Sequence, residues 1–484
     1  MVLKMNRFLH LLSAILGLPL TLLSLSGVAS AAPPAARVST DKDRSKVTVT
    51  IYNQNFGLVR EVRTLDALPN GEVSLEFADV AATIQPETVH IRSLTNPQGL
   101  AVLEQNYRYD LLTPEKLLEK YVGRPVRVYR YHEAKAEEQA VDAKLLSVAG
   151  GPILQIGKEI TFGYGGRFAF PQVPEDLIAR PTLMWLLESR QPKQSVEVSY
   201  LAREMSWNAD YVMVLDDKET RADLTGWVTL SNQTGASYKD AELKLVAGDV
   251  NRVEPQGQNL SGIAYKSTQS RDMRMREESL FEYHLYTLGR PTTLRNNEQK
   301  QVTLLEGRGL GVTKKLVLPS QMYWFRSQNG QVQTNQKVAV QLEFENSQKN
   351  QLGVPLPKGT LRVYKADKAG SQQFVGEDAI DHTPRDEKVR VKIGDAFDVV
   401  GDRKQMKWTA LGNCSSESAW EVELRNHKDT AVEVESIEAT GGDWTIVSSS
   451  LPAERKDAQT FAFRAKVPAH GKVKLTYVVR VRWC

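Results

Sequence analysis

The side chains best suited to chemistry are gathered in one short stretch, residues 377–386. The stretch carries four carboxylates and one imidazole, on Glu377, Asp378, Asp381, His382 and Asp386. Such a group could hold a divalent cation or perform acid–base chemistry, because a carboxylate beside histidine raises its basicity and fixes its tautomer. Aspartates also cap turns through their own side chains, and a charged hairpin turn is the interpretation we prefer. We assign no catalytic residue and keep Glu377, Asp378, Asp381 and His382 as candidate binding residues.

Other chemical motifs are weaker. The sequence has no HExxH, GxSxG or Walker loop and no paired-cysteine metal spacing, so no cofactor or metal is expected. Glycines 307, 309 and 311 precede two lysines, but a strand-like run follows them where a phosphate loop would need a helix, and a glycine-rich hairpin is favoured. The aromatic run 323–325 fits core packing better than a sugar-binding platform.

The chain contains two cysteines, Cys414 and Cys484. In an oxidising compartment the pair is expected to form a disulfide that ties the last residue to the start of the last domain. The alternative is two unrelated thiols. The bridge interpretation leaves neither thiol as a nucleophile.

The N-terminus has the pattern of a secretory signal peptide. Lys4 and Arg7 precede an apolar stretch over residues 8–28, and Ala29-Ser30-Ala31 predicts cleavage between Ala31 and Ala32. An uncleaved membrane anchor is the alternative, because the stretch approaches the ~20 residues needed to span a bilayer. No later run is apolar enough for a transmembrane helix. We therefore expect a periplasmic or secreted protein whose mature chain has no transmembrane helix.

The charge balance argues against a nucleic-acid partner. The formal net charge is +4, and cleavage would remove Lys4 and Arg7 and lower it to +2. A nucleic-acid-binding protein would be expected to carry a clustered basic face.

The elements that must position these side chains are predicted to be strands. Apolar and polar residues alternate over residues 47–51, 196–200, 338–344 and 473–483, which is typical of strands with one buried face. One short helix is expected after Thr113, which can cap it, with Pro114 at its first position and Gly123 after its end. The fold class is therefore mostly β: several tandem β-sandwich or immunoglobulin-like domains with a small barrel-like β insert and one short helix.

The domain organisation follows from composition and turns. After the signal peptide (1–31), we expect an N-terminal β domain (32–112) and a helix with a small barrel or bent sheet (113–180). A β-sandwich (181–335) with a mobile loop (251–278) comes next. A β domain bearing a Pro-Leu-Pro motif (336–404) and a C-terminal immunoglobulin-like sandwich (405–484) complete the chain.

The motif stretch, residues 342–365, reads LEFENSQKNQLGVPLPKGTLRVYK. It resembles the hallmark of a bacterial envelope family, domain of unknown function 4139, some of whose members are described as mucoidy-inhibitor-like. Three further stretches resemble that family, namely SNQTGASYKDAELKLVAGDV from Ser231, EYHLYTLGRPTTLRNNEQKQV from Glu282 and VGEDAIDHTP from Val375. The resemblance covers roughly residues 46–484 and implies no particular reaction. Mucoidy-inhibitor-like relatives carry a long coiled coil, whereas no heptad pattern is sustained in this chain.

These observations favour an exported envelope protein of unestablished activity that acts as a non-catalytic binding or scaffolding module, with an envelope protein or polysaccharide as partner. The alternative is a hydrolase or cation-dependent enzyme acting on envelope polymers, centred on residues 377–386. A second alternative is an outer-membrane β-barrel, because the last strand alternates and ends near Trp483.

Overall fold

The computed structural model describes residues 35–132, 137–248, 250–251 and 275–484. The expected signal peptide and its cleavage point at Ala31 and Ala32 lie outside the described residues, as do residues 252–274 of the expected mobile loop. Strands dominate, and the described part contains one α-helix, α1 (Pro114–Lys120). The prediction of a mostly β fold is confirmed.

Two sheets build the N-terminal half. The smaller has the order β1 (Ala35–Ser39), β4 (Gly71–Ala78), β12 (Thr182–Ser189), β6 (Leu100–Arg108). The larger has the order β17 (Arg276–Leu280), β18 (Tyr283–Thr287), β16 (Tyr238–Ala247), β2 (Arg44–Tyr52), β3 (Phe56–Leu65), β13 (Gln194–Arg203), β5 (His90–Ser93), with β19 (Thr292–Leu294) beside β16. Residues 276–278, expected in the mobile loop, therefore lie in β17, where they pair with β18.

A thirteen-stranded sheet continues the molecule to its C-terminal end. Its main path is β23 (Gln372–Ile380), β22 (Gly359–Ala366), β14 (Met205–Leu215), β15 (Arg221–Asn232), β20 (Glu298–Pro319), β21 (Gln333–Glu345), β24 (Lys388–Gly412), β25 (Ser415–Asn426), β30 (Gly471–Arg482), β27 (Asp443–Ser449). Beside this path lie β26 (Val432–Ala439), β29 (Thr460–Val467) and β28 (Ala453–Arg455). The short 3-10 helices are η1 (Asp41–Asp43), η2 (Pro86–Thr88), η4 (Met322–Phe325) and η5 (Gln348–Asn350).

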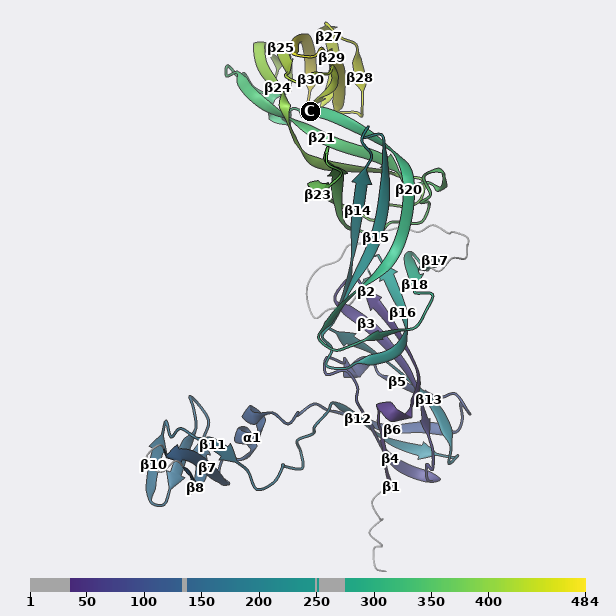
Figure 1. Ribbon diagram of the computed structural model, residues 1–484, viewed down its shortest axis with the longest axis vertical. Coiled ribbons are helices and arrows are strands. Elements are labelled where there is room, and N and C mark those ends of the chain that lie inside the picture. Colours follow the sequence, from purple (N-terminus) through teal and green to yellow (C-terminus); the bar gives the residue numbers. More distant parts are fainter. Residues whose placement is uncertain (1–34, 133–136, 249, 252–274) are drawn as a thin grey trace, which may run out of the picture.

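The insert between β6 and β12 is a separate small unit. Its sheet has the order β10 (Glu159–Phe162), β9 (Ile153–Ile156), β8 (Glu137–Ser147), β7 (Pro125–His132), β11 (Arg167–Ala169), which is open and not barrel-like. Thr113 caps α1 by accepting the N–H of Lys116 at 3.2 Å, and Pro114 opens the helix, as expected. In Figure 1 the insert projects sideways from an elongated body.

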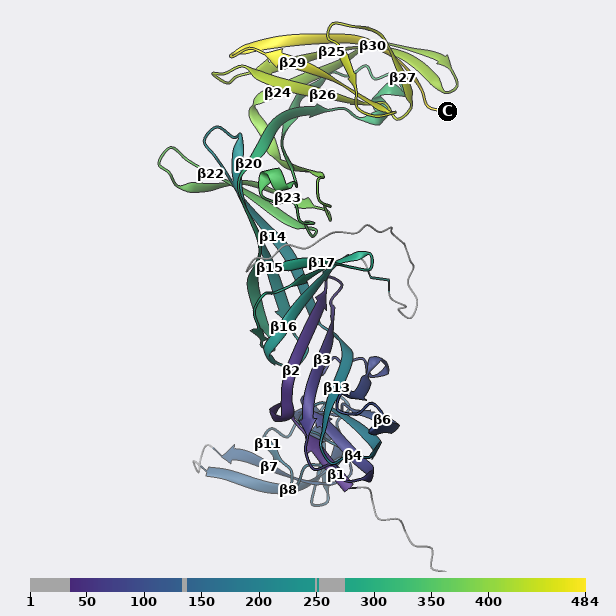
Figure 2. The same ribbon diagram turned by 90° about the vertical axis from the view of Figure 1, so that its right-hand side faces the viewer.

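The described residues form three hydrophobic cores. The first draws buried residues from 47 to 391, the second from 316 to 481, and the third belongs to the insert. The second core lies between the two layers of the C-terminal sandwich seen in Figure 2, with Trp420 on β25 and Phe461 on β29. Tandem domains with one core each would not give this overlap of the first two cores along the sequence.

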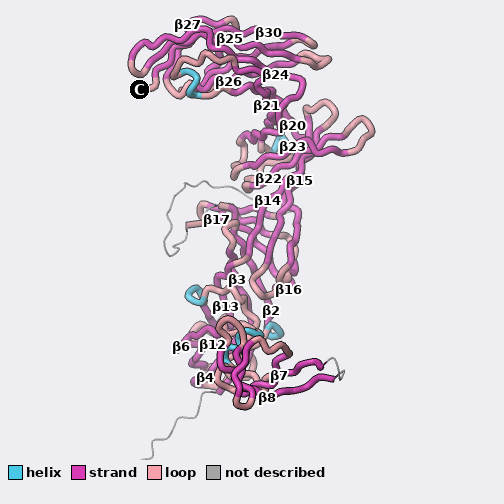
Figure 3. Tube along the Cα trace, turned by 90° about the vertical axis from the view of Figure 1, so that its left-hand side faces the viewer, coloured by secondary structure: helices cyan, strands magenta, loops and turns pink. Residues whose placement is uncertain are grey.

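Two long strands explain the overlap. β20 has 22 residues and β24 has 25, and both run from the middle of the body into the C-terminal sandwich, as Figure 3 shows. The boundary expected at 335/336 lies inside β21, and the one expected at 404/405 lies inside β24. Gly307, Gly309 and Gly311 lie within β20, where the pairing with β15 shifts register, and do not form a hairpin.

Three buried asparagines each end or follow a strand and hold the next loop. Each side-chain amide donates to two main-chain carbonyls, one from each of two segments, at 2.8–3.1 Å. The acceptors are Ala236 and Arg295 for Asn232, and Val354 and Pro384 for Asn346. For Asn426 they are Thr430 and Pro468. After each loop the chain returns as a strand parallel to an earlier one, β16 beside β2, β22 beside β14 and β26 beside β20. The chain thus repeats one strand–asparagine–strand arrangement three times.

In the described parts of the chain, no helix has the length and apolar character needed to cross a bilayer.

Candidate functional site

The carboxylate-rich stretch begins on β23 and continues into the turn after it. Glu377 and Asp378 are neighbours on β23, and successive residues of a strand point to opposite faces of a sheet. Asp381 and His382 follow the strand, and Asp386 has a positive φ of 64° in the turn. Within the described residues, no three His, Cys, Asp or Glu side chains come close enough to hold a metal ion. The structure therefore does not bring this stretch together as one site.

Glu377 belongs to a polar ladder across five strands. Its carboxylate lies 3.0 Å from Arg362 on β22, which also donates to Asp210 on β14 at 2.9 Å. Asp210 accepts from Thr229 on β15, which accepts from Gln301 on β20. The hydrogen bond to Asp210 raises the pKa of Arg362, so the guanidinium group stays protonated. Glu377 thus helps to hold neighbouring strands together.

Asp378 connects β23 to β24, a strand with which β23 forms no ladder. One carboxylate oxygen accepts the N–H of Lys392 on β24 at 2.7 Å, and the other accepts the N–H of Ala379 at 2.9 Å. Each oxygen of Asp378 therefore has one main-chain N–H as its partner, and the carboxylate joins β23 to β24.

His382 is likewise used in packing. Its Nδ1 accepts the main-chain N–H of Lys358 at 3.2 Å. Nε2 lies 3.5 Å from the side-chain amide of Asn53, in the turn between β2 and β3. Asp381 is exposed, and its carbonyl accepts from Thr383. The imidazole therefore joins the N-terminal sheet to the segment after the Pro-Leu-Pro motif.

The Pro-Leu-Pro motif is held by two buried tyrosines. Tyr211 donates to the carbonyl of Pro357 at 2.8 Å, and Tyr286 donates to that of Pro355 at 2.9 Å. Burial raises the pKa of both hydroxyls, so they remain donors at neutral pH. Between the prolines, Leu356 exchanges two main-chain bonds with Thr383. Prolines cannot donate to a ladder, but their carbonyls accept well, and the motif is held by β14, by β18 and by the segment after β23.

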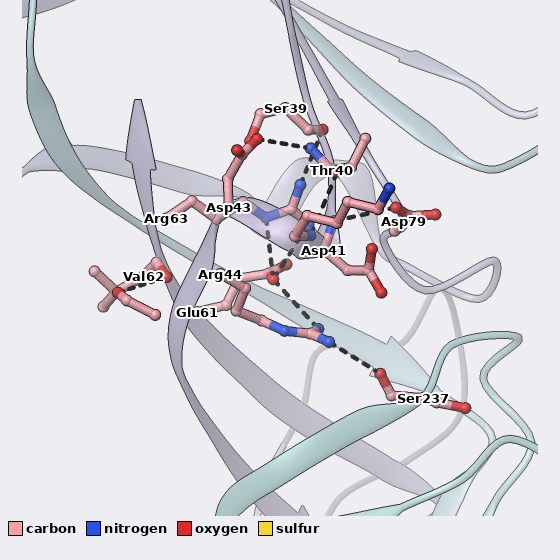
Figure 4. Close-up of polar contacts among 12 residues, drawn as sticks. Ser39, Thr40, Asp41, Asp43, Arg44, Glu61, Val62, Arg63, Asp79 and Ser237 are labelled. Carbon is pink, nitrogen blue, oxygen red and sulfur yellow. Dashed lines mark hydrogen bonds and ion pairs between the residues drawn. The ribbon is translucent and has the colours of Figure 1, made fainter. Parts of the chain in front are cut away.

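Sequence reasoning missed a buried ionic cluster in the N-terminal half, which Figure 4 shows. Arg63 donates to Glu61 at 3.2–3.3 Å and to the carbonyl of Ser39 at 3.1 Å, and its guanidinium lies 3.4 Å from the ring centre of Phe77. Arg44 approaches the same Glu61 oxygen at 3.6 Å. Glu61 and Arg63 are fully buried. Burial raises the pKa of Glu61, and the two guanidinium groups oppose that effect.

A second buried pair occupies the C-terminal sandwich. Arg403 on β24 pairs with Glu438 on β26, and its guanidinium lies 5.3 Å from a ring centre of Trp324. Ser436 donates to Glu438 at 2.7 Å. The aromatic run 323–325 proves to be a 3-10 helix, in which Trp324 and Phe325 are buried and Tyr323 is exposed. Core packing is confirmed for two of the three rings.

The alternation of side chains along β3 could have revealed the ionic cluster around Glu61 and Arg63. Val59, Glu61, Arg63 and Leu65 alternate on β3, so the two charged residues share the buried face of their apolar neighbours. Two charges on a buried face indicate a paired ionic cluster, because an isolated buried charge is too costly.

The disulfide between Cys414 and Cys484 is present, with a Cα–Cα distance of 5.5 Å. It joins the turn after β24 to the chain end, where the N–H of Trp483 also donates to the carbonyl of Cys414.

Comparison with known proteins yields one family. A family model described as "Domain of unknown function (DUF4139)" matches residues 196–484. No curated protein matches the chain. The match begins on β13 and includes both long strands, the Pro-Leu-Pro motif and the C-terminal sandwich.

Proposed function

The chain belongs to the DUF4139 family, a family defined by a domain of unknown function, and we propose that it is an exported, non-catalytic scaffold that binds partners through sheet faces and edges. One observation carries the proposal. Of the side chains best suited to chemistry, Asp378 and His382 contact a strand or turn outside the β22–β23 hairpin, and Glu377 forms an ion pair with Arg362 inside it. They support the fold at the point where several strands meet.

The shape of the molecule also favours a scaffold. β20 and β24 continue from the first core into the second, so no flexible linker separates the middle of the body from the C-terminal sandwich. An elongated body of this kind would hold the surfaces along it at fixed separations. Sheet edges and faces would supply contacts for an envelope protein or polysaccharide.

Export is supported by the sequence pattern at the N-terminus and by the disulfide. Disulfides persist in oxidising compartments and are rare in the cytosol. We propose a periplasmic or secreted location, with the mature chain starting at Ala32. Mass measurement of the protein recovered from the cell envelope tests this: a cytosolic chain that retains residues 1–31 would contradict export.

The scaffold role is tested in cells that lack their own copy of the protein. An Asp381→Ala/His382→Gln variant is expected to rescue loss of the protein as wild type does, because Gln can still accept the N–H of Lys358. It should also retain the wild-type set of cross-linked envelope partners. Asn346→Ala is the matched control, because it removes the amide that holds the Pro-Leu-Pro loop and should fail by unfolding.

The opposite outcome would favour an enzyme. If Asp381→Ala/His382→Gln has a wild-type urea midpoint, keeps its partners and yet fails to rescue, then acid–base or cation chemistry at this segment is required and the scaffold proposal is wrong.

A further inference from the structure

The insert ends in a strand edge that has no ladder partner among the described residues. β10 closes the order of the five-stranded sheet and pairs only with β9. In Figure 1 it lies at the outer end of the insert, away from the elongated body. Ile160 and Phe162 on this strand are 69% and 83% exposed. β10 contains no proline, lysine or register shift; its edge protections are its length of four residues and the charge of Glu159.

The register of the β9–β10 hairpin shows which main-chain groups are available. Ile156 pairs with Glu159 across a two-residue loop, and the pair that closes such a loop is hydrogen-bonded. Hydrogen-bonded and non-hydrogen-bonded pairs alternate along an antiparallel ladder. Ile160 and Phe162 therefore occupy non-hydrogen-bonded positions. Their N–H and C=O groups point away from β9, toward the open edge.

The side chains of β10 divide between the two faces. Thr161 pairs with Leu154, which is fully buried in the core of the insert, so Thr161 faces that core. Ile160 and Phe162 lie on the opposite face. The open edge thus combines outward main-chain donors and acceptors with two exposed apolar side chains.

We propose that β10 pairs antiparallel with β10 of a second copy of this chain. The register places Thr161 opposite Thr161 of the second copy, on the two-fold axis. Ile160 of each copy then lies opposite Phe162 of the other copy. This register uses the outward groups of Ile160 and Phe162 in both copies. Such an interface is isologous and closes as a dimer.

Self-complementarity is the reason to choose a second copy as the occupant. Aromatic with β-branched pairs and threonine pairs are among the favourable cross-strand combinations, and this register supplies both. Glu159 falls opposite Gly163 of the second copy, so no like charges face each other. The edge is short, and the buried area is expected to lie below the roughly 1,000 Å² of a stable interface, so the dimer should dissociate on dilution.

Cross-linking through Thr161 tests the register. Both native cysteines are in the disulfide, so Thr161→Cys in the mature protein introduces a single free thiol. Non-hydrogen-bonded antiparallel pairs have Cα atoms about 4.5 Å apart, which lies within disulfide range. Mild oxidation should therefore give a covalent dimer. Lys158→Cys, in the hairpin loop, is the matched control and should stay monomeric, because this register separates the two Lys158 residues.

A second variant tests the main-chain contacts. Ile160→Pro removes an N–H that points outward and leaves the bonds between β9 and β10 in place. Sedimentation should show concentration-dependent dimerisation of wild type and at least a tenfold weaker association of Ile160→Pro. Phe281→Ser, which removes an equally exposed ring from the β17–β18 turn, should associate as wild type does.

Several outcomes would overturn the proposal. A wild-type protein that is monomeric at every concentration would favour a different extended segment as the partner of this edge. Equal cross-linking of Thr161→Cys and Lys158→Cys would show random collision. Unchanged association of a folded Ile160→Pro would place the dimer interface elsewhere. The inference rests on the geometry of the insert alone and is independent of export and of the scaffold role.

Discussion

At the scale of single residues, the charges buried most deeply in this protein are paired inside its hydrophobic cores. Arg63 and Arg403 are each fully buried, each paired with a fully buried glutamate, and each placed over an aromatic ring. A buried ionic pair contributes little beyond an apolar replacement of similar volume, but breaking it leaves an uncompensated charge. The two members of each pair should therefore be strongly coupled.

The coupling is testable at Arg63. Arg63→Met should lower the free energy of unfolding by roughly 3–5 kcal/mol, because Glu61 is left buried beside Arg44 alone. Glu61→Leu/Arg63→Met should recover much of that loss. Urea denaturation followed by circular dichroism gives both values, and Arg60→Ala, on the exposed face of the same strand, is the control. If Arg63→Met were as stable as Glu61→Leu/Arg63→Met, then Glu61 and Arg63 would not be energetically coupled.

A partly buried pair on β24 and β25 gives a pH-dependent prediction. Asp402 accepts from Arg425 at 2.5 and 3.0 Å and from the N–H of Asn335 at 2.7 Å. Hydrogen bonds from Arg425 lower the pKa of Asp402 below its ordinary value of about 3.9. Its stabilisation should be present above about pH 4 and disappear as the pH falls through the lowered pKa.

Asp402→Asn should consequently cost about 1 kcal/mol at pH 7 and progressively less below pH 4. Thermal unfolding of both proteins between pH 2 and pH 7 measures the difference. A difference that stays constant over this range would mean that the carboxylate charge of Asp402 is not the stabilising factor.

At the scale of elements, alternation predicted strands well but not their partners. Residues 47–51 and 473–483 were recognised because period-two patterning is a local property. The parallel pairing of β2 with β16 joins segments nearly two hundred residues apart, and no local signal reports it. β21 and β24 run through the boundaries expected at 335/336 and 404/405, so strand structure continues across both positions.

The candidate site was predictable only in part. The sequence identifies Glu377, Asp378, Asp381 and His382 as polar neighbours, and it permits a turn. Their actual partners lie on β22, on β24 and in the β2–β3 turn, so the structural role appears only once the sheets are assembled.

The asparagine arrangement gives an element-level prediction. Asn426→Ala removes the amide that holds the carbonyls of Thr430 and Pro468 and the oxygen that accepts from Lys428. The C-terminal sandwich should lose about 2–4 kcal/mol, because buried main-chain groups are left without partners. Asn413→Ala, at an exposed position in the turn before Cys414, should change stability by less than about 0.5 kcal/mol. Equal urea midpoints for the two variants would show that the side chain of Asn426 does not stabilise the sandwich.

The disulfide between Cys414 and Cys484 makes a separate contribution to the same sandwich. It closes a separation of 70 residues, for which the chain-entropy model gives roughly 4 kcal/mol. Mature protein should gain no mass on alkylation until it is reduced, and Cys414→Ser/Cys484→Ser should unfold at lower urea concentration. Alkylation of the untreated protein would refute the bridge.

At the scale of the whole molecule, shared strands make the middle of the body and the C-terminal sandwich one rigid unit. β20 and β24 contribute residues to sheets on both sides of the junction, so bending there would break ladder pairs on several strands at once. Rigid spacing is what the proposed scaffold requires.

The most direct test of this rigidity is the distribution of distances between spin labels on Asp217→Cys, in the turn between β14 and β15, and Ser448→Cys, on β27. Both positions are exposed, and the native cysteines are bridged. A single narrow distribution that is unchanged by temperature is the predicted result. A broad or two-peaked distribution would show a hinge between the two parts and would contradict the account.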